Sequence, residues 1–487
     1  MNKKAFGLIA LLALLGSQQA AMAKVKLPHV LASNMVLQQD TQVKLWGKAK
    51  PNAKVTIKTS WDGKTYKTTA ANDSTWLVNV KTIKADNKPY EITISDGEAL
   101  TLNNILMGEV WYCSGQSNME MPMRGFDRQP LKGTNAIIAK QKPSTPIRMF
   151  ITDKKNGAWY RQFAKTPQED CYGVWLDNRP ENVAECSATA YFFAKYLQDV
   201  LDTPVGLIIS TLGGAKVEPW MSQEAISQFK DIDLSILSND KKPNIWQDPC
   251  VLYNAKTAPF LNYTIKGMLW YQGESNRNNA DQYRQLMPAF VKDLRQKWNL
   301  GEFPFFFVQI APFRYGGEQK TDAAKMREIQ AYNAKEIPNA GMVCTLDIGA
   351  PNFIHPMDKE TLGTRLALMA LGKTYGRKGF GYESPTYKSM EKKDGKIYIN
   401  MDNAPFGGVC PMWTSLKGFE IAGEDKVFHP AFAEVEEKTC RLAVSSKDVP
   451  DPVAVRYCYH NYAEASVFNL YGLPLVPFRT DNWELKK

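Results

Sequence analysis

The sequence has few of the residues that build metal sites and disulfide frameworks. Among 487 residues there are four histidines and eight cysteines, and no two cysteines stand in a Cys-x-x-Cys arrangement. The spacings typical of structural zinc sites and small disulfide scaffolds are therefore missing. We expect no metal ion, and the sequence assigns no cysteine pairing.

Long apolar runs and long basic runs are missing as well. Beyond residue 23 no stretch reaches about 18 uninterrupted apolar residues, which argues against a membrane span in the mature chain. The formal net charge is +10, but the charges are interspersed and no five basic residues follow one another. This pattern is typical of a solvated surface and gives no support for nucleic-acid binding.

The first 23 residues have the layout of a secretory signal peptide. Lys3 and Lys4 form a basic start, residues 8–15 are apolar, and residues 21–23 (Ala-Met-Ala) offer a cleavage site. Removing this segment, which holds two lysines and no acidic residue, would lower the net charge from +10 to +8. We therefore expect an exported protein, periplasmic or secreted. The alternative is a segment retained as an anchor.

Three regions of the chain differ in their hydrophobic pattern. Residues 24–105 carry short alternating segments separated by turn residues, which predicts a small β-sandwich. Residues 106–378 alternate apolar strand segments with helical stretches, which predicts an α/β domain with a parallel sheet and helices on both faces. Residues 379–487 return to strand-like segments and predict a β-rich C-terminal domain.

Two serines follow predicted strands of the α/β region in nearly the same setting. Ser117 stands in Ser-Gly-Gln-Ser-Asn (residues 114–118), and Ser275 stands in Gln-Gly-Glu-Ser-Asn (residues 272–276). Reactive groups gather at the carboxyl ends of the strands in an open parallel sheet, so either serine could be a nucleophile. Each could equally cap a helix. The residues alone do not choose between them.

A serine nucleophile needs a base, and histidine is the usual one. Of the four histidines only His355 follows a predicted strand of the α/β region, and the other three lie in the flanking β-regions. Gly213 and Gly214, directly after another predicted strand, could bring backbone N–H groups close to a ligand or form an ordinary turn.

Taken together, these segments resemble the sialate O-acetylesterase family of the SGNH-hydrolase superfamily. The resemblance runs through nearly the whole mature chain and is clearest in residues 108–119, 213–222, 270–275 and 354–359. Residues 108–119 (Gly-Glu-Val-Trp-Tyr-Cys-Ser-Gly-Gln-Ser-Asn-Met) form the most specific block. The resemblance implies an SGNH-type three-layer α/β/α catalytic domain flanked by N-terminal and C-terminal β-rich domains.

The resemblance also implies roles for individual residues. Ser117 would be the nucleophile and His355 its base, whereas Ser275 would have no catalytic role. The superfamily places an aspartate three residues before its histidine, but that position here is Asn352. Glu274 is the preferred acid behind the histidine, and Asp347 is the second choice. The oxyanion hole would comprise the backbone N–H of Ser117, that of Gly213 or Gly214, and the side-chain amide of Gln272.

The implied activity is hydrolysis of O-acetyl esters on carbohydrates, with O-acetylated sialic acids as the first expectation. No metal or organic cofactor is needed for this chemistry. Xylan or another acetylated glycan is an alternative substrate for the same residues. A catalytically inactive carbohydrate-binding protein is an alternative of a different class.

Overall fold

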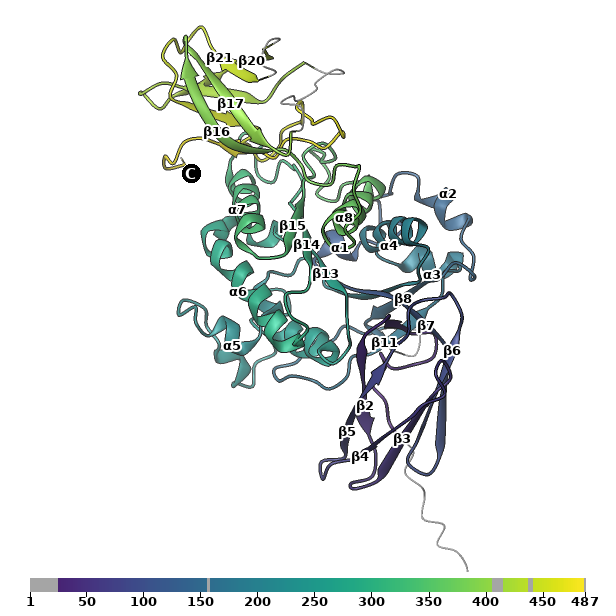
Figure 1. Cartoon of the computed structure of the whole chain (residues 1–487). Coiled ribbons are helices and arrows are strands. Elements are labelled where there is room, and N and C mark those ends of the chain that lie inside the picture. The colour runs from purple at the N-terminus through teal and green to yellow at the C-terminus, as the bar shows by residue number, and fades with distance from the viewer. Residues whose placement is uncertain (1–24, 156–157, 405–414, 437–440, 486–487) are drawn as a thin grey trace, which may run out of the picture.

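The computed structural model describes residues 25–155, 158–404, 415–436 and 441–485. The chain forms a central α/β part with a β-rich part at each end, which Figure 1 shows at the bottom and top of the molecule. The predicted signal peptide, Cys410 and Cys440 lie outside the described residues. Within the described residues no helix is both long and apolar enough to cross a membrane.

Seven strands of an 11-stranded sheet form the centre of the α/β part. Their order is β11-β8-β12-β7-β13-β14-β15, and all neighbours are parallel except β11, which runs antiparallel to β8 at the edge. The strands are β7 (Ala99–Gly115), β8 (Ile147–Thr152), β11 (Gly173–Leu176), β12 (Val205–Thr211), β13 (Gly267–Tyr271), β14 (Phe305–Val308) and β15 (Ala340–Val343). Strands β8, β12, β13, β14 and β15 are buried along their whole length, as strands covered on both faces must be.

Helices cover both faces of this sheet. Successive residues of β7 point to opposite sides, so that Trp111 packs in one apolar core and Tyr112 in the other. Phe193 and Leu366 share the core of Trp111, whereas Phe290 shares that of Tyr112. Figure 1 accordingly shows α4 (Ala188–Leu201) and α8 (Lys359–Lys373) on one side of the strands and α6 (Ala280–Trp298) and α7 (Asp322–Glu336) on the other. The remaining helices are short: α1 (Ser117–Glu120), α2 (Thr134–Ala139), α3 (Pro180–Glu185) and α5 (Gln223–Ile226).

The N-terminal β-region is joined to the central sheet through one long strand. Strand β7 pairs with β6 near its start and with β12 and β13 near its end. The expected border between residues 105 and 106 therefore falls inside a strand that both parts share. The other strands of this region are β1 (Val36–Gln38), β2 (Gln42–Lys48), β3 (Lys54–Thr59), β4 (Thr65–Thr69), β5 (Thr75–Lys81) and β6 (Tyr90–Ser95).

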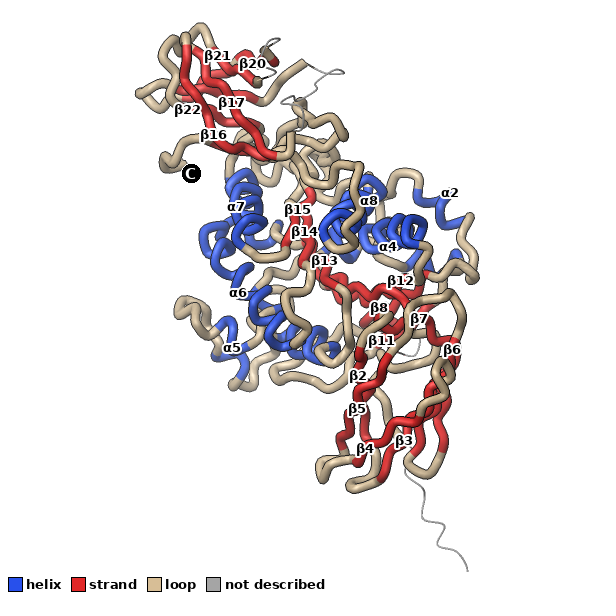
Figure 2. Tube along the Cα trace, viewed as in Figure 1, coloured by secondary structure: helices blue, strands red, loops and turns tan. Residues whose placement is uncertain are grey.

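The C-terminal region holds two four-stranded antiparallel sheets, which lie together at the top of Figure 2. Their strand orders are β16-β17-β21-β20 and β19-β18-β22-β23. The strands are β16 (Thr386–Lys393), β17 (Lys396–Asp402), β18 (Phe419–Ala422), β19 (Phe428–Pro430), β20 (Phe432–Val435), β21 (Leu442–Ser445), β22 (Ala454–Tyr457) and β23 (Phe478–Arg479). Between α8 and β16 the chain has no strand or helix, and the expected border at residues 378–379 lies there.

Candidate active site

Three central strands end at the same level of the sheet. Gly115 at the end of β7 is in register with Thr211 at the end of β12 and with Tyr271 at the end of β13. The loops that follow carry Ser117, the Gly213-Gly214 pair and residues 272–276 respectively. The sheet thus brings three separate predicted segments to one edge.

Glycine is required where β7 and β13 leave the sheet. Gly115 has φ +137°, and a Cβ there would lie 2.1 Å from the carbonyl oxygen of Tyr271. Gly273 has φ +154°, and a Cβ there would lie 2.7 Å from a methyl group of Ile310. A side chain at either position would combine strained backbone with a steric clash. These two glycines permit the tight approach that places Ser117 beside the second run.

Ser117 and His355 are in direct contact. The Ser117 hydroxyl lies 2.8 Å from Nε2 of His355, and Nδ1 of the same ring lies 2.5 Å from Oε1 of Gln129. An amide oxygen only accepts hydrogen bonds, so Nδ1 carries the proton and Nε2 is left to accept the serine proton. Phe126 packs edge-on against the imidazole, with ring centroids 5.4 Å apart. The ring is therefore held in the tautomer that a general base needs.

The surroundings of His355 keep its imidazole neutral. Burial lowers the pKa of His355 to about 4, and the nearby positive charge of Lys359 acts in the same direction. The ring is consequently unprotonated, and able to accept a proton, at every pH above about 4.

Neither expected carboxylate reaches His355. Glu274 Oε1 accepts a 2.6 Å hydrogen bond from the side-chain amide of Asn118, and Asp347 makes a two-pronged ion pair with Arg365 at 2.7 and 2.6 Å. The structure therefore differs from the expectation of an acid behind the histidine: the place at Nδ1 is taken by the neutral Gln129. The guanidinium of Arg365 gives Asp347 two charge-assisted hydrogen bonds.

Glu274 instead belongs to a buried network centred on Asn118. The Asn118 amide donates to Glu274 and, at 3.1 Å, to the backbone carbonyl of Ile354, the residue before His355. Its Oδ1 accepts a 2.6 Å hydrogen bond from Nζ of Lys359. Burial raises the pKa of Glu274 and lowers that of Lys359 to about 7. The network ties Asn118, the residue after Ser117, to the loop that carries His355.

The oxyanion-hole candidates are brought together only in part. Gly213 lies against Ser117, since a Cβ built on it would be 3.5 Å from Cβ of Ser117. Its N–H donates to the carboxylate of Glu120. The Gln272 amide does not face the serine, because its Nε2 donates to the Ala215 carbonyl at 3.2 Å and to Asn276 Oδ1 at 2.7 Å. Both N–H groups of Gln272 are thus used, which differs from its expected role.

The second serine has a different partner. The Ser275 hydroxyl donates to the carbonyl of Gly214 at 2.8 Å. No histidine is hydrogen bonded to Ser275 among the described residues. The geometry therefore gives a base to Ser117 and none to Ser275.

Sequence reasoning missed four side chains of this site. Asn118 and Glu120 stand within three residues of the nucleophile, and Lys359 ends the 354–359 block, so the motifs themselves contained their signal. Gln129 had none, because it lies in an irregular loop between α1 and α2 with no feature that marks it. In the part of the chain that the structure describes, no cluster of histidine, cysteine and acidic side chains could hold a metal ion.

Comparison with known proteins identifies the family. A family model described as carbohydrate esterase, sialic acid-specific acetylesterase, matches residues 107–372. The chain belongs to this family. Human sialate O-acetylesterase is 29% identical to it over 428 residues, which cover 80% of this chain and 78% of the human protein. The mouse sialate O-acetylesterase is 27% identical over 446 residues, which cover 79% of this chain and 80% of the mouse protein.

A solved structure extends the comparison to the fold of the whole chain. The crystal structure of a carbohydrate acetylesterase from Xanthomonas citri superposes with a TM-score of 0.84 at 32% identity, covering 94% of this chain and 100% of that chain. The family resemblance and the SGNH-type α/β fold with added β-rich regions are thereby confirmed. This member of the sialic acid-specific acetylesterase family is an ester hydrolase that acts on carbohydrates.

Proposed function

We propose that this esterase removes O-acetyl groups from sialic acids through an acetyl-enzyme on Ser117, and that it works outside the cytoplasm. The observation that carries the proposal is the chain of contacts Ser117–His355–Gln129, which joins a partly exposed hydroxyl to a neutral imidazole. The curated names of the human and mouse relatives support sialic acid as the sugar. The signal-peptide pattern of residues 1–23 supports export.

In the first half of the reaction His355 Nε2 takes the proton of Ser117 while Oγ attacks the acetyl carbonyl carbon. The carbonyl electrons move to oxygen, and the N–H groups of Ser117 and Gly213 stabilise the resulting oxyanion. The carboxylate of Glu120 must leave Gly213 for this to happen, because it uses that N–H in the free enzyme. The C–O bond to the sugar then breaks, and the imidazolium returns a proton to the sugar oxygen.

In the second half water replaces the sugar. His355 takes a proton from the water molecule, whose oxygen attacks the acetyl carbon of the ester on Ser117. The tetrahedral species collapses to acetate, and the serine oxygen regains its proton from the imidazolium. Throughout, the Gln129 carbonyl holds Nδ1–H and stabilises the imidazolium with a dipole instead of a full negative charge.

A second candidate substrate is another acetylated glycan such as xylan. The 32% identical solved structure from Xanthomonas citri is that of a carbohydrate acetylesterase. The contacts between Ser117, His355 and Gln129 suit an acetyl ester on any sugar hydroxyl. The choice of sugar therefore depends on the other side chains around Ser117.

The test combines kinetics with mass spectrometry. Purified protein and the Ser117→Ala variant are assayed for acetate release from p-nitrophenyl acetate, O-acetylated sialic acids and acetylated xylan. We expect turnover that requires Ser117, a rapid-quench species heavier by one acetyl group, and preference for sialic acids. Undiminished turnover by Ser117→Ala would overturn the acyl-enzyme. Preference for xylan would leave the esterase chemistry intact and replace the substrate.

A further inference from the structure

A cavity of about 280 Å³ lies beside the residues that surround Ser117 and His355. Two of its lining residues already touch the site: Glu120 accepts the hydrogen bond from Gly213, and Phe126 packs on His355. Trp159 and Arg161 also line it. Its volume is near the lower end of the range for small-molecule sites and is suited to a single sugar ring. A sugar ring bound here would lie within reach of Ser117.

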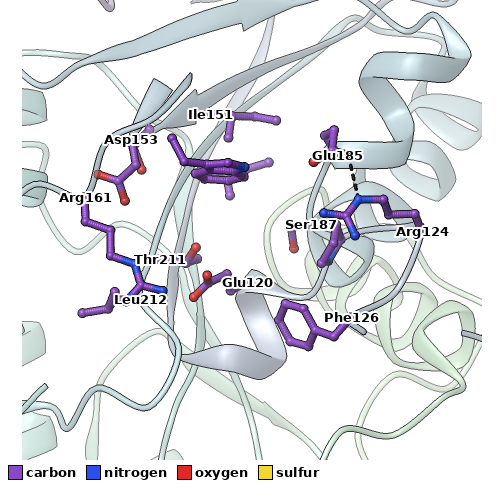
Figure 3. A pocket seen from close by; sticks show the side chains of 14 residues that line it. Glu120, Arg124, Phe126, Ile151, Asp153, Arg161, Glu185, Ser187, Thr211 and Leu212 are labelled. Atoms are coloured by element: carbon purple, nitrogen blue, oxygen red, sulfur yellow. Dashed lines mark hydrogen bonds and ion pairs between the residues drawn. The ribbon is translucent and has the colours of Figure 1, made fainter. Parts of the chain in front are cut away.

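Most charges of this cavity are neutralised within the protein. Asp153 is paired with Lys256, which is itself buried. Glu185 accepts a 2.7 Å hydrogen bond from Arg124 (Figure 3). The carboxylate of Glu120 accepts a hydrogen bond from the Gly213 N–H but keeps its negative charge. Among the described residues, Arg124 is paired with Glu185, and Arg161 is the lining cation that makes no ion pair.

Arg161 is placed to meet a ligand. Figure 3 shows its side chain extending along the cavity toward Leu212 and Glu120. No hydrogen bond or ion pair joins its guanidinium to another side chain among the described residues, and Glu120 is not within ion-pair distance. A planar guanidinium with free N–H groups matches a carboxylate with two parallel hydrogen bonds. An unpaired arginine here favours an anionic group on the ligand.

Trp159 supplies the apolar part of the same cavity. The residue ends β10 (Ala158–Trp159), which pairs with β9 (Lys154–Lys155), and 57% of it is exposed. Nζ of Lys154 lies 3.8 Å from the centre of the indole ring. A sugar presents C–H groups that pack on the face of such a ring. The hairpin therefore combines a stacking surface with a nearby cation.

We propose, on the basis of the esterase function above, that this cavity is the subsite for a sugar that bears a carboxylate. Arg161 pairs with the carboxylate and Trp159 packs against the ring, while the acetyl ester reaches Ser117. Both sialic acids and uronic acids offer this chemistry. The subsite makes Arg161 a specificity-determining residue that the ester chemistry itself does not need.

The test measures KM and kcat for four acetyl esters with the Arg161→Gln variant. The substrates are p-nitrophenyl acetate, an O-acetylated sialic acid, an O-acetylated uronic acid glycoside and an O-acetylated neutral xyloside. Losing a charge-assisted pair of this kind raises KM for the two acidic sugars by about 10- to 100-fold. We expect the other two substrates to change by less than about twofold, and Arg161→Lys to restore part of the loss.

Two further variants serve as controls. Lys142→Gln removes one positive charge from an exposed side chain that precedes β8, at the edge of the sheet opposite to the site, and should change none of the four values. Trp159→Ala should raise KM for acidic and neutral sugars by the same factor, because stacking does not depend on charge. Far-ultraviolet circular dichroism and thermal melting confirm that each variant is folded.

The outcomes separate the subsite from the proposed function. Equal effects of Arg161→Gln on acidic and neutral sugars, or no effect on either, would overturn the carboxylate subsite. So would a wild-type enzyme that hydrolyses no acidic sugar. Hydrolysis of the uronic acid ester alone, lost selectively with Arg161→Gln, would support the subsite and overturn sialic acid as the substrate. Turnover that survives Ser117→Ala would overturn the acyl-enzyme whatever Arg161 does.

Discussion

Replacing Gln129 with glutamate tests whether Gln129 is the hydrogen-bond partner of Nδ1 of His355. Gln129 Oε1 lies 2.5 Å from Nδ1 of His355, and burial with the charge of Lys359 sets the pKa of His355 at about 4. A carboxylate at this distance favours the charged imidazolium and typically shifts a pKa by about 1–3 units. We therefore expect the pKa of His355 in Gln129→Glu to rise to roughly 5–7.

The sign of the kinetic effect follows from the role of the base. Only neutral His355 accepts the serine proton, so kcat/KM is lost as pH falls through its pKa. The acidic limb of the pH profile should move from about 4 in the wild type to roughly 5–7 in the variant. Each unit corresponds to about 1.4 kcal/mol of added imidazolium stability. The imidazolium forms in the transition state, so one such unit of added stability lowers the barrier. The plateau of kcat above pH 7 should therefore rise by roughly tenfold.

The assay is the pH dependence of kcat/KM with p-nitrophenyl acetate, which carries no sugar. Gln129→Leu is the matched control, because it removes the hydrogen-bond acceptor without adding charge. We expect it to lower kcat/KM by roughly 10²-fold, less than the about 10⁴-fold seen where the wrong tautomer is held. An acidic limb that stays near 4 in a folded Gln129→Glu variant would refute the assignment of Gln129 as the partner of Nδ1.

Three further predictions concern the surrounding charges. Glu274→Gln should lower the free energy of unfolding in urea by about 1–3 kcal/mol. The acidic limb of the pH profile should stay in place, since Glu274 does not contact the imidazole. A large loss of kcat at unchanged stability would show that Glu274 is the triad acid after all. Lys359→Met removes a positive charge that lowers the pKa of His355, so the acidic limb should move upward from about 4, and a downward shift would contradict this. Glu120→Ala frees the Gly213 N–H, so KM for p-nitrophenyl acetate should fall by roughly 3- to 10-fold; an increase would show that Glu120 helps to bind the ester.

The architecture was predictable because hydrophobic period and strand–helix alternation are local properties of a sequence. Fully apolar strands such as residues 205–209 identified a sheet covered on both faces, and the structure confirms this for β12. The continuity of β7 from the N-terminal region into the central sheet was not predictable. The start of β7 has exposed residues, whereas its end is fully buried. The hydrophobic pattern therefore changes within the strand and predicts two separate segments with a border at residue 105.

The site was predictable where the sheet fixes it and unpredictable where loops cross between elements. Ser117 and Gly213 follow neighbouring strands that end in register, so strand order alone brings them together. The orientation of Gln272 and the partner of Nδ1 depend on side chains from irregular segments. Gln129 is 226 residues from His355 in the sequence, and no local pattern reports such a contact.

The near-duplicate runs after β7 and β13 show why one serine has a base and the other does not. In each run the asparagine after the serine turns inward and holds a buried carboxylate: Asn118 donates to Glu274 at 2.6 Å, and Asn276 donates to Glu218 at 2.9 Å. The two runs are also hydrogen bonded to each other. Gln116 Oε1 of the first run accepts 3.4 Å hydrogen bonds from two backbone N–H groups of the second run. Asn118 of the first run donates to Glu274 of the second run. Asn118 alone also contacts the loop of the base, through the Ile354 carbonyl. The second run therefore supports the position of the first. Glu274, which we expected at the imidazole, instead orients Asn118, and Asn118 binds the backbone next to His355.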